Sequence, residues 1–315
     1  IRRLYSKDQI LLILQNNEEI DKFLPLFKLF SYDSELLDFP AWDCMPYDDI
    51  SPTKSIINRR FKTFKQREKI RDKPCLILTS IDALIQKVPI TDEIKKLFLK
   101  FTTKCSYNII QIRKDLQDLG YKRVNLVLEP NEYAIRGGII DIWPLGEAVP
   151  YRLDFFGDQL DEIKIFNPIS QIANTKVNSI LIESPIEVPL NDINVDNFVT
   201  NYRKIFGPVV NKDLLIHTIK TKHRLEGVEH WLPLFYSTNL VNLFNFFNPS
   251  LVIAKNDLLS MIKKKIKEIQ NIYNEKSTFY EENRDENNGP LTPNKLYVEE
   301  LELSQCLQKI NKCFI

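Results

Sequence analysis

Short, wholly apolar runs near both ends of the chain predict buried strands of a parallel sheet. They occupy residues 10–14, 75–79 and 251–254, and each is short enough for a strand bounded by polar segments. Segments with helical apolar spacing lie between them, beginning at Ser55, a suitable N-cap, and at Leu258. Ser80 follows the second run and can cap a helix over residues 81–87. This order predicts a doubly wound α/β domain.

The middle of the chain has a different pattern, in which polar and apolar positions alternate over short strands. The strands are predicted at residues 138–143, 151–156 and 162–166, with turns at residues 144–147 and 157–158. A helix closed by Gly120 precedes them. We therefore expect a small α+β module inserted into a larger α/β domain. The expected division is residues 1–104, 105–186 and 187–315.

Composition favours a water-soluble protein. Apolar residues make up 43% of the chain and charged residues 27%, as in globular domains, and no run approaches the ~18 apolar residues of a membrane span. The five cysteines are scattered without a CxxC pair, so we expect reduced thiols, no zinc site, a cytoplasmic location and no membrane partner. The abrupt ends, without an initiator Met, suggest a fragment of a longer protein.

The charge balance argues against a chain that grips nucleic acid electrostatically. The net charge is +1, and the densest basic run, Lys263-Lys264-Lys265, lies on an apparent amphipathic helix. A solvated helix face explains that run, although a local basic face for DNA stays an alternative.

Glycine usage bears on catalysis. The chain has eight glycines, the first at Gly120, and contains neither GxxxxGK[ST] nor GxGxxG. A phosphate-binding loop needs glycines so that several backbone N–H groups can converge on the anion. We therefore expect any nucleotide-binding fold here to have lost its site, with no cofactor and no enzymatic activity in this chain.

Other catalytic groupings are weak. A carboxylate set could bind Mg²⁺, or could equally be the exterior residues of strands and turns. Its members are Asp141, Asp154, Asp158, Asp161 and Glu162. The three histidines, His217, His223 and His230, show no catalytic arrangement with serine or cysteine.

The alternating module is a candidate binding surface. Arg136 precedes Gly137-Gly138, a pair suited to a bulge or bend. Arg152 and Phe156 are four residues apart, so on a regular strand they share one face. Arginine beside an aromatic ring is typical of interface hot spots. The alternative, that Phe156 belongs to the core and Arg152 is a solvated strand residue, is equally compatible with the spacing.

Two stretches of this module resemble a motif shared by the UvrB and Mfd families of DNA repair proteins. They are EYAIRGGIIDIWP, residues 132–144, and YRLDFFGDQLD, residues 151–161. The segments FPAWD, residues 39–43, and GVEHWLPLF, residues 227–235, resemble the Mfd family, the transcription-repair coupling factors. A UvrB-type repair protein, or a DNA- or nucleotide-processing enzyme domain, is the alternative, but UvrB carries a P-loop that this chain lacks.

The resemblance implies a fold, a partner and a set of contact residues. The flanking parts would form a degenerate helicase-like α/β domain, and the inserted module would bind the repair protein UvrA. Arg136, Arg152 and Phe156 fall on positions that contact UvrA in Mfd relatives, with Gly137, Gly138 and Gly157 shaping the motif. RNA polymerase, double-stranded DNA, ATP and Mg would be bound by other domains of the full protein. The UvrA-binding face would be masked there until the motor engages stalled polymerase.

Overall fold

The chain forms two compact units in the computed structural model, which describes residues 9–30, 35–70, 73–208, 214–282 and 289–314. Unit 1 combines Ile1–Thr91 with Asn197–Ile315, and unit 2 is the continuous segment Asp92–Asp196. Strand β4 (Phe98–Thr102) lies before residue 105, where we expected the inserted module to begin. It nevertheless belongs to unit 2, because it pairs antiparallel with β11 (Ser179–Glu183).

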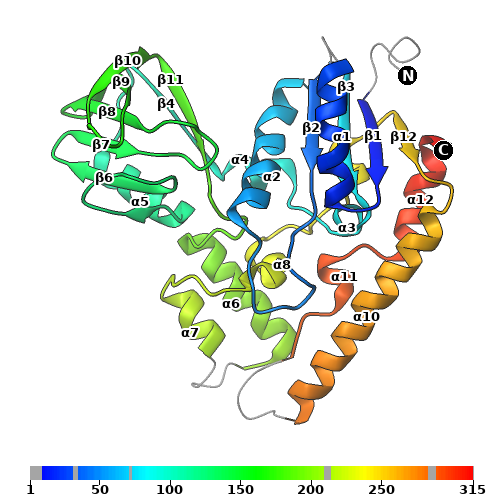
Figure 1. The fold of residues 1–315 in the computed structure, drawn as a ribbon. Coiled ribbons are helices and arrows are strands. Elements are labelled where there is room, and N and C mark those ends of the chain that lie inside the picture. The colour runs from blue at the N-terminus through cyan, green and yellow to red at the C-terminus, as the bar shows by residue number, and fades with distance from the viewer. Residues whose placement is uncertain (1–8, 31–34, 71–72, 209–213, 283–288, 315) are drawn as a thin grey trace. The chain divides into compact units, whose positions relative to one another are not determined.

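A five-stranded parallel sheet organises unit 1 (Figure 1). Its order is β13-β12-β1-β3-β2, and every neighbouring pair is parallel. The strands are β1 Gln9–Leu14, β2 Glu35–Phe39, β3 Cys75–Ser80, β12 Leu251–Ala254 and β13 Asn311–Phe314. The three apolar runs of the sequence are thus the three central strands, which confirms the predicted parallel α/β sheet.

Helices cover both faces of this sheet. Alternate residues of β1 separate the faces: Leu12 lies in a core cluster with Ile20 of α1 (Asn17–Phe30). On the other face, Phe39 of β2 packs against Phe64 of α2 (Lys54–Arg67), with ring centroids 5.4 Å apart. The sequence therefore buries both faces, as parallel sheets require.

The remaining helices follow in chain order. They are η1 Glu68–Ile70, α3 Ile81–Ile85, α4 Thr91–Lys95, α6 Asp192–Phe206, α7 Leu214–Lys220, η2 Val228–Trp231, α8 Leu232–Phe235, α9 Leu243–Phe247, α10 Leu258–Glu282, α11 Pro293–Leu296 and α12 Glu300–Lys309. Within the described ranges, no helix has the length and apolar character needed to cross a membrane.

Capping residues decide two of the predicted boundaries. Ser80 caps α3 as predicted, because its hydroxyl accepts a hydrogen bond from the Ala83 N–H at 3.3 Å. The N-cap prediction at Ser55 is wrong, since α2 already begins at Lys54. The predicted loop at residues 283–290 falls mostly outside the described residues.

Unit 2 is a six-stranded sheet with a helix against one face. The sheet order is β10-β9-β8-β7-β6-β5, antiparallel except for the β5–β6 pair. The elements are α5 Ile109–Leu119, β5 Lys122–Arg123, β6 Glu132–Arg136, β7 Ile139–Ile142, β8 Tyr151–Phe156, β9 Gln159–Phe166 and β10 Ala173–Val177. Gly120 ends α5 with φ 96°, as the C-cap prediction requires.

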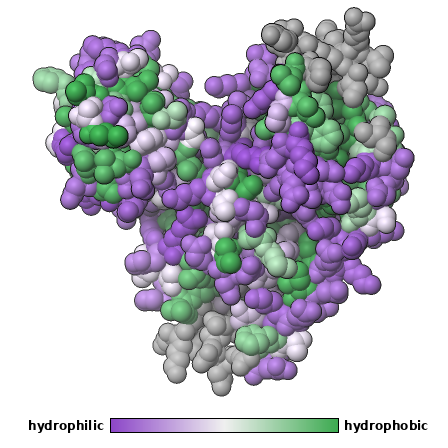
Figure 2. Space-filling view, viewed as in Figure 1, coloured by the Kyte–Doolittle hydropathy of each residue, from purple (hydrophilic) through white to green (hydrophobic). Residues whose placement is uncertain are grey.

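The core of unit 2 lies between α5 and the sheet. Ile112 and Leu116 of α5 pack with Ile140 and Leu153 of the central strands in one buried cluster. The opposite face of the sheet has a smaller cluster around Phe166. Hydrophobic residues also gather at the surface of this unit, which carries the green groups beside β6–β9 in Figure 2.

Candidate functional site

Two tight hairpin turns lie side by side at one end of the unit 2 sheet. Arg136 pairs with Ile139 across the first turn, and Phe156 pairs with Gln159 across the second. Strands β7 and β8, which carry one end of each turn, are neighbours in the sheet. The two-residue turn at 157–158 is the one predicted from sequence. The pair at 137–138, predicted as a bulge or bend, is itself a turn.

The glycines of these turns are required by two different constraints. Gly137 and Gly157 adopt φ values of 59° and 60°, in the left-handed region that glycine tolerates best. Gly138 meets a packing constraint instead, because a Cβ there would lie 2.8 Å from the carbonyl oxygen of Phe155. The turns are therefore fixed in shape and set the direction of the residues beside them.

Phe156 projects into solvent from the end of β8. Its side chain belongs to the face opposite α5, because Leu153 and Phe155 point to the α5 core. Phe156 is 84% exposed, whereas Leu153 is fully buried. The alternative that Phe156 is a core residue is therefore wrong. Arg152 lies on the same face as Phe156, as the four-residue spacing predicts.

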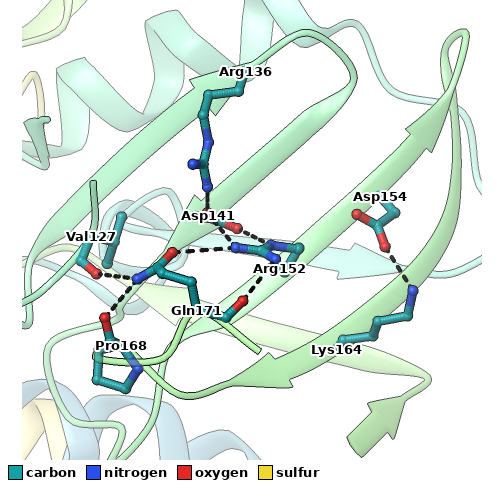
Figure 3. Close-up of polar contacts among 8 residues, drawn as sticks. All are labelled: Val127, Arg136, Asp141, Arg152, Asp154, Lys164, Pro168 and Gln171. Atoms are coloured by element: carbon teal, nitrogen blue, oxygen red, sulfur yellow. Dashed lines mark hydrogen bonds and ion pairs between the residues drawn. The ribbon is translucent and has the colours of Figure 1, made fainter. Parts of the chain in front are cut away.

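A buried carboxylate holds both predicted arginines (Figure 3). The side chain of Asp141 is fully buried, and the Nε of Arg152 donates to it at 2.7 Å, with Nη2 donating to its second oxygen at 3.0 Å. Arg136 donates to the same carboxylate. The Arg152 guanidinium also lies over the Phe166 ring, 4.9 Å from its centroid. Hydrogen bonding to Asp141 raises the pKa of Arg152.

The two arginines differ in what they leave open. The Arg152 side chain is only 18% exposed, and Arg136 is 47% exposed. Two further donors of Arg152 reach Gln171, one to its backbone oxygen at 3.2 Å and one to its side-chain oxygen at 3.4 Å. The alternative that Arg152 is a solvated strand residue is therefore also wrong. Arg136 and Phe156 are the two predicted site residues that present exposed groups.

Sequence reasoning did not assign the central role of Asp141 or the contribution of Gln171. A signal for Asp141 was present, since a lone aspartate within the apolar strand of residues 139–142 must be paired when it is buried. Gln171 lies in a loop with φ 60°, and nothing in its sequence neighbourhood predicts that this loop folds back on β8.

The carboxylates considered as Mg²⁺ ligands are engaged by cations. Lysines on the same strands, or across the sheet, neutralise them, and hydrogen bonds from Lys164 and Lys176 lower the pKa of Glu162 to about 2. The pairs are Asp154–Lys164 at 2.9 Å, Glu162–Lys164 at 2.5 Å, Glu162–Lys176 and Asp161–Lys104. In the part of the chain that the structure describes, no group of three His, Cys, Asp or Glu residues could hold a metal ion.

The phosphate position of a nucleotide-binding fold, between the first strand and its helix, is occupied in unit 1 by the chain's own side chains. The Asn16 side-chain oxygen accepts from the Glu19 N–H at 3.0 Å, and the Glu19 carboxylate accepts from the Gln15 N–H at 2.8 Å. This reciprocal arrangement is a capping box. Lys255, which follows β12, pairs with Glu19 at 2.9 Å. A carboxylate therefore stands where an anion would bind.

Comparison with known proteins first assigns unit 2 to a class. The sequence model of the UvrB interaction domain family matches residues 99–185, which include both hairpin turns and the Asp141 cluster.

Similarity to transcription-repair-coupling factors extends over nearly the whole chain. The factor of Rickettsia bellii is 30% identical over 98% of this chain and 27% of its own length. The factors of Haemophilus influenzae and Escherichia coli are 29% and 28% identical, over 86% and 74% of this chain. The chain belongs to the transcription-repair-coupling factor family, and it spans only 20% to 27% of the length of these three relatives.

Proposed function

We propose that unit 2 recruits the excision-repair protein UvrA through the end of its sheet that carries the two hairpin turns. The exposure of Phe156 supports this most directly, because an aromatic side chain that is 84% exposed on a rigid turn contributes little to folding. Arg136 beside it supplies a half-exposed positive charge. A partner surface with an apolar pocket and a nearby carboxylate would complement this pair.

The test is UvrA affinity of the full 315-residue chain carrying Phe156→Ala. We expect binding at least tenfold weaker, because buried aromatic anchors dominate interface energies. Phe279→Ala is the matched control: Phe279 is also an exposed phenylalanine, at 60%, but lies on α10 in unit 1. Equal affinity of wild type and Phe156→Ala, with unchanged circular dichroism, would remove the basis for this proposal.

We further propose that unit 1 is a degenerate helicase-like domain without catalytic activity. Its parallel sheet, assembled from two chain segments, and the capping box of Asn16 and Glu19 support this. Equilibrium titration with Mg-ATP should detect no saturable binding, because the Glu19 carboxylate would repel the phosphates. Saturable binding with ATP hydrolysis would instead favour the nucleotide-processing alternative.

In the full-length factor, ATP-driven movement on DNA and binding to RNA polymerase would belong to segments outside these 315 residues. We propose that the UvrA-binding face is masked there until the motor engages stalled polymerase. Comparing the UvrA affinity of this chain with that of the full-length factor tests masking. Equal affinities would contradict it.

A further inference from the structure

The loop between β9 and β10, residues 167–172, presents apolar side chains that the fold does not use. Ile169 is 91% exposed and Ile172 is 63% exposed. The loop is nevertheless well braced: the Asn167 side-chain oxygen accepts from the N–H groups of Ile169 and Ser170, both at 2.9 Å. Its two ends are joined by a hydrogen bond from the Asn167 N–H to the Ile172 carbonyl at 2.9 Å. Both isoleucines are thus held outward on a rigid support.

Gln171 ties this loop to a second loop that also exposes apolar side chains. Its Nε2 donates to the carbonyl oxygens of Pro168 at 2.6 Å and Val127 at 3.4 Å (Figure 3). Val127 is buried, but its neighbours Leu126 and Leu128 are 39% and 51% exposed. The Gln171–Val127 contact therefore brings the exposed apolar residues of both loops to one region of the surface.

Arg152 supports this region from below. Its guanidinium has five N–H donors, and four hydrogen bonds use them inward, two to Asp141 and two to Gln171. Arg152 therefore cannot offer a two-pronged contact to a carboxylate on another protein without releasing the fully buried Asp141. Its hydrogen bonds instead connect the strand that ends in Phe156 to the loop that carries Ile169.

We propose that Ile169 and Ile172 form a second contact area for UvrA, and that Arg152 is a positioning residue that holds this area in place through Gln171. The inference rests on the proposed function. Its support is continuity, because Arg136, Arg152 and Phe156 share the sheet face onto which the loop is tied. The part of UvrA that it fits is apolar and uncharged, unlike the acidic surface expected opposite Arg136.

The first experiment measures UvrA affinity for the chain carrying Ile169→Ser and Ile172→Ser together. We expect at least a tenfold loss. Ile110→Ser is the matched control: Ile110 is 80% exposed in the same unit, but it lies on α5, which packs against the opposite face of the sheet. Phe156→Ala is measured in the same assay and reports on the proposed function independently.

The outcomes separate the two proposals. Weaker binding by Phe156→Ala together with unchanged binding by the isoleucine variant overturns the second contact area and leaves UvrA recruitment standing. Unchanged binding by both variants overturns both proposals. Light scattering must show that the wild-type chain does not self-associate through the isoleucines, since loss of a dimer in the serine variant would assign the area to a second copy.

The second experiment tests the positioning role of Arg152. Arg152→Lys is introduced into wild type and into the double isoleucine variant, and the UvrA affinities form a double-mutant cycle. If Arg152 acts through the loop, Arg152→Lys weakens binding several-fold in wild type and much less once Ile169 and Ile172 are serine. Hydrogen exchange of residues 167–172 should rise in Arg152→Lys. Equal losses in both backgrounds would show that Arg152 contacts UvrA directly.

Discussion

Replacing Arg152 with alanine should destabilise unit 2, because it leaves a buried carboxylate short of its main partner. Asp141 has a fully buried side chain and receives two hydrogen bonds from Arg152, at 2.7 Å and 3.0 Å. Removing one member of a buried ion pair costs ~3–5 kcal/mol. Arg136 remains bound to Asp141, so we expect a loss of about 2–4 kcal/mol in the free energy of unfolding.

Lys164→Ala provides the internal comparison, since Lys164 is also a paired cation on the face opposite α5. Its partners Asp154 and Glu162 are 29% and 28% exposed, and pairs open to water contribute less than ~1 kcal/mol. Hydrogen exchange of peptides from residues 139–156, followed across a urea series, measures the opening of unit 2 locally. A loss for Arg152→Ala no larger than that for Lys164→Ala would refute the assigned role of the Asp141 pair.

The result also decides how binding data on Arg152→Ala are interpreted. If the variant opens unit 2, a loss of UvrA affinity reports partly on folding, and Arg152 is not evidence for a direct contact. Phe156→Ala removes only an exposed ring and does not have this ambiguity.

Three further changes test packing and protonation. Gly138→Ala places a Cβ 2.8 Å from the Phe155 carbonyl oxygen and should lower stability by ~1–3 kcal/mol in urea unfolding. Gly157→Ala meets open space and should cost only about 1 kcal/mol, from its positive φ; the reverse order would contradict this. Burial lowers the pKa of His230 to about 4, so the unfolded chain takes up this proton first. Stability should be complete above pH ~6.5 and fall by up to roughly 3 kcal/mol toward pH 4, and His230→Gln should remove that part of the pH dependence.

The sequence predicted the elements whose signal is local. Strands β1, β3 and β12 are continuous apolar runs, and Ser80 and Gly120 have side-chain or backbone properties that mark helix ends. Strands β2 and β13 lacked such signals, because edge strands need not be apolar on both faces; β13 is exposed along its whole length. The pairing of β4 with β11 joins segments far apart in sequence, and no local pattern specifies it.

The candidate site divides in the same way. Two-residue periodicity correctly placed Arg152 and Phe156 on one face, because strand geometry alone determines that relation. Which arginine would be free depended on Asp141, which pairs with both, and on Gln171, which reaches Arg152 from a loop with a left-handed residue. Such partners are set by tertiary folding, so exposure could not be predicted from spacing.

The assembly of the unit 1 sheet from two chain segments has a consequence for biosynthesis. Strand β1 is among the first parts of the chain to leave the ribosome, but its partner β12 follows only after all of unit 2, since Leu11 pairs with Val252. Unit 2 is continuous and can complete its core first. Until β12 emerges, the apolar β1 has an open edge, which is a template for aggregation. Slow translation of residues 197–254 should therefore lower the soluble yield of the chain more than slow translation of residues 255–315.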